Sequence, residues 1–292
     1  MASTKEFRQR IKSANNTKQI TKAMEMISSI KMQKAVKNIT MARSYIQNAW
    51  NILHMLSKTA LHHEHPLLNP KVINKTAVIL ITSDRGLCGS YNNEVIKKLI
   101  EFNKDSSDCD IVAIGKVGAG FISSKKLGNL TSEFKGFEND FTIEDIIPIS
   151  KMTFGEYLTG KYDKVVLIYS HYVSSIKQSP VVQQLLPIVA ENISDAELWE
   201  KTEEAKDTDY KFEPDADEVL EGVLKQIVRT QIYGAILEAN ASEQSARMLA
   251  MKNATDSASD LIDDLTLLYN SLRQDTITRE IAEISGAAEA MK

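Results

Sequence analysis

The sequence has 292 residues, 43% hydrophobic and 25% charged, the composition of a globular protein with one ordinary core and an extended part. It has no apolar run long enough to span a membrane. Cys88 and Cys109 are not in a metal-like spacing and favour a reducing compartment without a disulfide framework. The formal net charge of -4 conceals a basic segment over residues 1–37 and an acidic one over residues 191–221.

The start of the chain predicts one long helix. Ser3 and Glu6 have capping-box spacing, and the first proline and glycine come only at Pro66 and Gly86, so a helix over residues 4–61 is expected. Its second half carries a coiled-coil seam, with apolar residues alternately three and four apart. That seam is Met32, Ala35, Ile39, Ala42, Ile46, Ala49, Leu53 and Leu56. An earlier apolar run is out of register with it, which predicts a stutter in the supercoil. The earlier run is Ile20, Ala23, Ile27 and Ile30.

A second seam lies at the other end of the chain. Residues 215–285 contain no proline, and their apolar side chains recur at the same interval, which predicts a helix with Pro214 as its first residue. Neither seam has a partner within its own helix. We therefore expect the two terminal helices to form a long antiparallel coiled coil. The second seam is Met251, Ala254, Ala258, Leu261, Leu265, Leu268 and Leu272.

Between the two helices, strand and helix patterns alternate. This alternation predicts an inserted α/β domain with a doubly wound, mostly parallel sheet. The expected strands are residues 76–82, 110–114, 131–137, 164–170 and 181–188. The expected helices are residues 92–102, 117–124 and 143–158. The predicted domains are therefore the N-terminal helix over 1–65, the insert over 66–213 and the C-terminal helix over 214–292.

Two glycine turns in the insert are candidate ligand sites. Residues 83–89 follow the first strand, at the edge where open sheets bind ligands, and residues 115–120 form a glycine-rich turn. Neither matches GxGxxG or GxxxxGK[ST], so tight backbone packing is favoured over a nucleotide site. A Cys88 nucleophile with His171 as its base lacks the nucleophile-elbow spacing. A nucleotide-binding enzyme remains the alternative to an interaction protein, as does a homodimeric coiled-coil scaffold.

Two charged segments could also suggest ligands. The run His62, His63, Glu64 and His65 cannot converge on one metal ion and predicts a solvated linker. The basic face of the first helix has Phe7 as its only aromatic residue and no recognised nucleic-acid motif. An acidic protein surface is the expected partner of this face, and no nucleic acid is expected.

Three stretches resemble the gamma subunit of F-type ATP synthase, of the bacterial type. They are residues 2–35, the loop SDRGLCGSYNN at 83–93, and residues 242–290, and their order spans the whole chain. The resemblance implies a rotor shaft without catalytic activity of its own. Such a shaft couples proton-driven rotation of a c-ring to conformational cycling of catalytic beta subunits, for ATP synthesis or ATP-driven proton pumping.

The implied partners are three alpha and three beta subunits, the epsilon subunit and the c-ring. The implied location is peripheral, at the cytoplasmic face of the bacterial plasma membrane. No catalytic, cofactor-binding or metal-binding residue is implied. Lys22 and Met24 match the family's N-terminal contact segment with the beta subunits, and the loop around Cys88 matches the part near their C-terminal region. Tyr210 and Glu213 match the foot that meets epsilon and the c-ring. Positions that match C-terminal contacts with the collar are Arg247, Arg273, Gln274 and Thr278.

Overall fold

Two long helices and an inserted sheet domain make up the described chain. The long helices are α1, Thr4–Ser57, and α5, Ala216–Ala290. The chain divides into two compact units, which we call the helical unit, residues 1–29 with 247–292, and the sheet unit, residues 30–246. The computed structural model describes residues 4–57, 66–69, 72–105, 109–138, 141–188 and 216–291. The predicted helix boundaries at residue 61 and Pro214 lie outside these ranges.

The sheet unit contains a five-stranded sheet in the order β3-β2-β1-β4-β5. All neighbouring strands are parallel except β5, which runs antiparallel to β4. The predicted mostly parallel, doubly wound sheet is thus confirmed. The third strand ends earlier than predicted because the chain turns at Gly136, which has a φ of 91°. The strands are β1 Thr76–Ile81, β2 Cys109–Ile114, β3 Asn129–Phe134, β4 Lys164–Tyr172 and β5 Gln178–Leu186.

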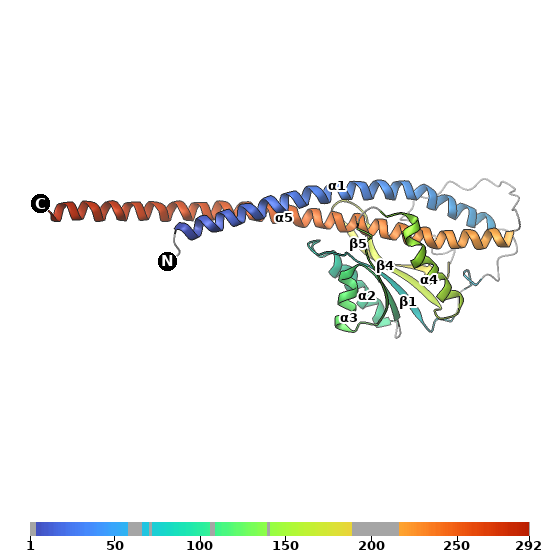
Figure 1. The fold of residues 1–292 in the computed structure, drawn as a ribbon. Coiled ribbons are helices and arrows are strands. Elements are labelled where there is room, and N and C mark those ends of the chain that lie inside the picture. The colour runs from blue at the N-terminus through green and yellow to red at the C-terminus, as the bar shows by residue number, and fades with distance from the viewer. Residues whose placement is uncertain are drawn as a thin grey trace. The chain divides into compact units, whose positions relative to one another are not determined.

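Helices cover both faces of this sheet. Figure 1 shows α2 and α3 on one face, and α4 with the first part of α5 on the other. Successive side chains of β1 point to opposite faces of the sheet, which explains the helix layer on each face. Val78 and Leu80 pack against α2 and α3, while Ile79 and Ile81 pack toward α4 and α5. The remaining elements are α2 Tyr91–Asp105, α3 Lys116–Lys125, the 3-10 turn η1 Ile143–Ile146 and α4 Ile147–Leu158.

A buried aspartate joins the amino ends of the strands. Asp110, at the start of β2, is 3% exposed. It accepts hydrogen bonds from Asn129 Nδ2 and the Tyr162 hydroxyl, each at 2.8 Å, and its Oδ2 lies 3.2 Å from Lys75 Nζ. Burial raises the pKa of Asp110, but its bonds to Asn129, Tyr162 and Lys75 outweigh burial and hold that pKa below its ordinary value of 3.8. The carboxylate is therefore favoured in the folded protein.

Asp110→Asn should lower the free energy of unfolding by about 1–3 kcal/mol near neutral pH, because it weakens charge-assisted bonds in a buried site. The pKa of Asp110 is lower in the folded than in the unfolded state. Its contribution is therefore complete above pH 3.8 and is lost as the pH falls through the folded-state pKa. Urea midpoints of both proteins between neutral and strongly acidic pH test this. The difference should shrink in acid, and a difference that stays constant would contradict the prediction.

Candidate functional site

The loop after β1 is held together by its own side chains. Asn92 Nδ2 donates to Ser83 Oγ at 2.7 Å and to Cys88 Sγ at 3.2 Å. Cys88 is 2% exposed, so its thiol packs inside the loop. Leu87 is instead the large hydrophobic side chain that this loop presents to solvent, at 63% exposure and with a φ of 62°. Sequence reasoning did not single out Leu87, because a hydrophobic residue beside a glycine turn carries no mark of exposure.

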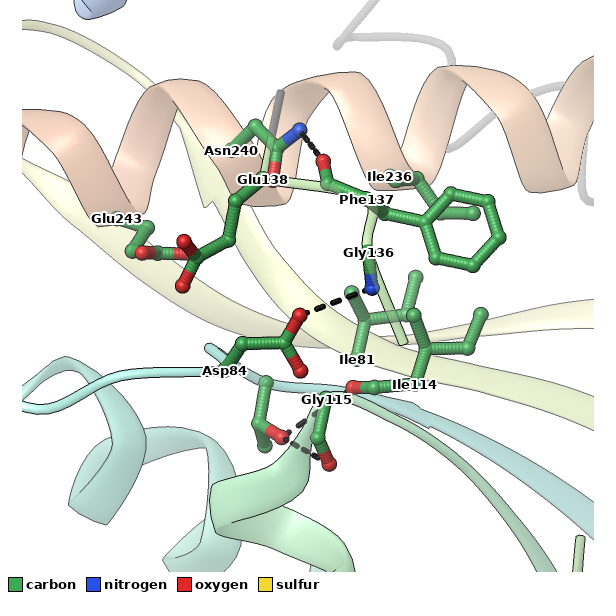
Figure 2. A pocket seen from close by; sticks show the side chains of 11 residues that line it. Ile81, Asp84, Ile114, Gly115, Gly136, Phe137, Glu138, Ile236, Asn240 and Glu243 are labelled. Atoms are coloured by element: carbon green, nitrogen blue, oxygen red, sulfur yellow. Dashed lines mark hydrogen bonds between the residues drawn. The ribbon is translucent and has the colours of Figure 1, made fainter. Parts of the chain in front are cut away.

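The first N–H groups of α3 already have protein acceptors. The donors and acceptors are Lys116 N to Asp84 Oδ1 at 3.0 Å, Val117 N to Ser83 O at 3.2 Å and Gly118 N to Thr82 Oγ1 at 3.0 Å. The second oxygen of Asp84 accepts from Gly136 N at 2.9 Å (Figure 2). A phosphate at a helix N-terminus would need these same donors. The carboxylate of Asp84 takes the place of such a phosphate. The expected tight backbone packing is found at this turn.

A hollow lies between this turn and α5 within the sheet unit. Its volume is about 10 Å³, room for about one water molecule. Figure 2 shows the carboxylates of Glu138 and Glu243 pointing toward each other beside it. A wider, open hollow of about 310 Å³ lies beside Phe134 and Phe141, with Lys135 as its one lining cation. Neither hollow combines the room and the free donors that a nucleotide needs.

The two residues of the weighed catalytic pair have separate partners. His171 Nδ1 lies 2.6 Å from Glu238 Oε2 of α5, and both side chains are buried. Cys88 instead contacts Ser83 and Asn92. These contacts give the thiol no base, so they do not support nucleophilic catalysis at Cys88.

The predicted partner-contact residues lie on both long helices. On α1, Lys22 is exposed and its Nζ lies 3.1 Å from Glu25, while Met24 is half-buried. On α5, Arg247 is 8% exposed. The three further positions Arg273, Gln274 and Thr278 are all exposed, in a stretch where residues 273–288 are exposed throughout. Tyr210 and Glu213 lie outside the described residues.

The buried face of α1 corrects the predicted stutter. In the helical unit it continues three and four residues apart through Ile11, Ala14, Lys18, Thr21, Glu25 and Ser28. In the sheet unit the same spacing runs through Met32, Ala35, Ile39 and Ala42, as predicted. The side chains of Ile46 and of residues 49–57 are outside the described part. Ile20, Ile27 and Ile30 are 61%, 54% and 66% exposed. The stutter was inferred from hydrophobicity alone, but small and polar side chains form this face.

The predicted seam of α5 is confirmed at five of its seven positions, including the half-buried Ala254, and wrong at two. Met251, Ala258, Leu265 and Leu272 are buried or half-buried, but Leu261 and Leu268 are 51% and 53% exposed. Covered positions outside the predicted seam include Thr255, Ile262 and Tyr269.

Contacts between the helices explain this register. Thr255 Oγ1 donates to Thr21 Oγ1 at 2.8 Å, and Arg8 donates to the Tyr269 hydroxyl at 2.8 Å. The two helices therefore run antiparallel within the helical unit. Hydrophobicity alone did not identify Thr255 and Tyr269 as covered positions.

The helices of the helical unit carry uncovered apolar side chains. On α1 these include Ile20, Met26 and Ile27, each more than half exposed. On α5 they are Leu261, Leu267, Leu268, Ile277, Ile281 and Ile284. Contiguous exposed apolar patches are typical of interaction surfaces.

The described residues contain neither a metal-binding cluster nor a membrane-spanning helix. Within the described ranges, no group of three or more His, Cys, Asp or Glu side chains could hold a metal ion. The histidine run at 62–65 lies outside those ranges. None of the helices in the described part of the chain is apolar over a length that would cross a bilayer.

Long helices with uncovered apolar residues, beside a sheet whose donors at the start of α3 already have protein acceptors, are typical of an interaction protein. Comparison with known proteins places the chain more closely. A family model described as ATP synthase matches residues 3–291.

Relatives and solved structures agree with that match. The chain is 37% identical to the ATP synthase gamma chain of Psychrobacter sp. (strain PRwf-1) over 295 residues, covering 100% of both. It is 36% identical to the gamma chain of Macrococcus caseolyticus (strain JCSC5402), again over 100% of both. The chain therefore belongs to the family of ATP synthase gamma chains.

Two solved structures have the same fold. A chain of the Tetrahymena thermophila mitochondrial ATP synthase central stalk and c-ring matches with a TM-score of 0.62 and 25% identity, covering 80% of this chain and 99% of that one. A chain of the Euglena gracilis mitochondrial ATP synthase matches with a TM-score of 0.66 and 16% identity, covering 99% and 94%.

Proposed function

We propose that this chain is the central rotor shaft of an F-type ATP synthase. It couples ion-driven rotation of a c-ring to the conformational cycling of catalytic beta subunits, and in reverse it carries ATP-driven rotation to proton pumping. The observation that carries this proposal is the set of uncovered apolar side chains on α1 and α5 of the helical unit, in a chain of the gamma family. A ring of three alpha and three beta subunits would cover them.

A full antiparallel coiled coil of α1 and α5 is part of the proposal. Its support in the helical unit is the pairing of Thr21 with Thr255. In the sheet unit, Ile39 packs with Leu237 and Ala241. We infer the same antiparallel pairing throughout, with helical segments over 1–65 and 214–292 and the insert over 66–213.

Partner assignments follow the predicted contact residues. Lys22 and Met24 contact the beta subunits, and the Cys88 loop does so through Leu87. Tyr210 and Glu213 belong to the foot that meets epsilon and the c-ring. The C-terminal collar contacts are Arg247, Arg273, Gln274 and Thr278. The chain acts as a non-catalytic subunit at the cytoplasmic face of a bacterial plasma membrane, held there through the complex.

An asymmetric shaft explains how such contacts act. A shaft that bound every beta conformation equally would shift none of them, so each beta subunit must meet a different face in turn. The two helices provide unlike faces: α1 is basic over residues 5–37, whereas the exposed part of α5 carries its apolar residues among acidic and polar ones. Rotation then presents each site with a different contact energy.

Assembly tests the proposal. The full chain mixed with alpha and beta subunits should form complexes with one copy per six-subunit ring and should change their ATPase activity. Ile20→Asp with Ile27→Asp should weaken assembly about 10-fold or more, because each places a charge where the ring buries an apolar side chain. The size and mass of the assembled complex at a series of concentrations measure this loss of assembly.

The matched control is Ile20→Leu with Ile27→Leu, which keeps apolar side chains at both positions and should assemble normally. Unchanged ring assembly and ATPase activity on adding the wild-type chain would refute the rotor proposal. A discrete homo-oligomer that ignores alpha and beta subunits would support a scaffold instead.

A further inference from the structure

One stripe of α5 is polar where it crosses the sheet. Glu238, Ser242 and Ser245 are four and three residues apart, so they share a face of the helix. They are 3%, 0% and 0% exposed. Earlier turns of the same helix contact the sheet through apolar residues such as Leu224, Val228 and Ala235. The helix thus changes from apolar to polar contact within the same unit.

Each polar residue of the stripe is bonded to β4 or to the turn that follows it. Glu238 Oε2 lies 2.6 Å from His171 Nδ1, and Ser242 Oγ donates to Ser170 O at 2.9 Å. Ser245 Oγ lies between two hairpin residues. It donates to Ser175 O at 2.6 Å and accepts from Gln178 Nε2 at 3.0 Å. We call these residues of α5 and the β4–β5 hairpin the hairpin clamp.

The environment of Tyr169 agrees with a close contact around Glu238. Tyr169 of β4 donates from its hydroxyl to Gln183 Oε1 at 3.0 Å. Burial, followed by the nearby charge of Glu238, holds the pKa of Tyr169 well above its usual value. The phenol therefore stays protonated beside Glu238, whose Oε2 contacts His171 Nδ1.

Stability alone does not account for such a contact. Burying polar or charged side chains costs desolvation, and replacing a buried ion pair with packed apolar side chains is often neutral or stabilising. Apolar contacts are non-directional, so they resist sliding or rotation of a helix only weakly. Hydrogen bonds are directional, and four of them over two turns fix both the axial register and the rotation of α5 against the hairpin.

We propose that the hairpin clamp is the mechanical link that fixes the rotational position of α5 on the sheet, so that torque passes between the inserted domain and the C-terminal helix. The inference rests on the proposed rotor function and names residues for one part of it. His171, Glu238 and Ser245 are positioning residues, because they act through the placement of α5 on the β4–β5 hairpin. Loss of the clamp leaves the helix packed but free to slip under load.

The test replaces the clamp with apolar contacts in the whole complex. The variant His171→Leu/Glu238→Leu/Ser245→Ala should keep or raise the melting temperature of the chain, assemble normally and hydrolyse ATP. Its protons pumped per ATP should fall at least two-fold when vesicles carry an opposing proton gradient. Proton uptake and hydrolysis are measured in the same vesicles. Equal coupling to the wild type under load would overturn the proposal.

Two controls separate the clamp from general effects. Lys161→Met/Glu156→Leu removes a surface ion pair of 2.7 Å on the same unit and should leave coupling unchanged. His171→Gln keeps an N–H donor for Glu238 and should retain coupling. If the triple variant does not fold, Ser245→Ala alone, which removes two hydrogen bonds, should still reduce coupling under load, and unchanged coupling in it overturns the proposal. If the wild-type chain itself fails to assemble, the rotor function is refuted first.

Discussion

Met251→Asp should unfold the helix pair of the helical unit, whereas Leu261→Asp in the same helix should not. Met251 is 6% exposed and Leu261 is 51% exposed, although hydrophobicity placed both on one seam. Removing a buried methionine and burying a charge together should cost about 4 kcal/mol or more. A typical domain has only about 5–15 kcal/mol of stability in total, so this loss is large.

Hydrogen exchange of the full chain measures this locally. Peptides over residues 14–28 and 251–262 should lose protection in Met251→Asp and keep it in Leu261→Asp. The helix propensity of aspartate is the same at both positions, so the second variant is a matched control. Leu261→Asp should instead weaken assembly with the alpha and beta ring. Equal loss of protection in both variants would show that the assigned buried face is wrong.

Gly115→Ala should severely destabilise the sheet unit. Gly115 has a φ of 102°, and an added Cβ would lie 2.2 Å from the backbone oxygen of Thr82, a distance that real Cβ atoms essentially never show. The turn cannot move away easily, because Gly115 N donates to Phe134 O at 2.9 Å and Thr82 N donates to Ile114 O at 2.8 Å. Backbone strain and the clash together should cost more than about 3 kcal/mol.

Gly120→Ala is the control for this substitution. Gly120 lies within α3, and nothing lies within 4 Å of a Cβ added there. Alanine should stabilise the helix by about 0.5–1 kcal/mol, because it loses less conformational freedom than glycine on folding. Urea midpoints of the two variants should therefore shift in opposite directions. A shift of the same sign and size in both would contradict the assigned conformation of Gly115.

The elements of the sheet unit could be predicted because each has a strong local signal. TAVILI of β1 is a short run that is apolar after its first residue, and all six of its residues are buried. The long helices were equally clear, since proline is absent and glycine rare over long stretches. Only element ends were misplaced, as at β3, where a single glycine turns the chain.

The register of the helix pair could not be predicted in the same way. Hydrophobicity selects Ile20, Ile27, Leu261 and Leu268, which are exposed, and misses Thr21, which is buried. Two helices that approach closely need small side chains between them, and a hydroxyl can be buried there when another hydroxyl meets it. Apolar residues that await a partner look identical in sequence to apolar residues that fill a core.

The internal bonds of the glycine turns were also hidden from the sequence. Asp84 satisfies donors from Lys116 and from Gly136, which is 52 residues further along the chain. Only the folded sheet brings these groups together. The same is true of Glu238 and His171, which are 67 residues apart.

The carboxylate of Asp84 has a consequence for how this domain responds to its surroundings. In many doubly wound sheets the backbone N–H groups at such a turn bind a soluble phosphate compound, so the domain has an empty and an occupied state. Here the chain provides its own anion covalently, so the occupancy is permanent. Changes in the cellular nucleotide concentration therefore do not alter the conformation of the domain at this turn. A subunit that transmits rotation benefits when its conformation does not depend on the concentration of ATP, the compound that its complex makes and consumes.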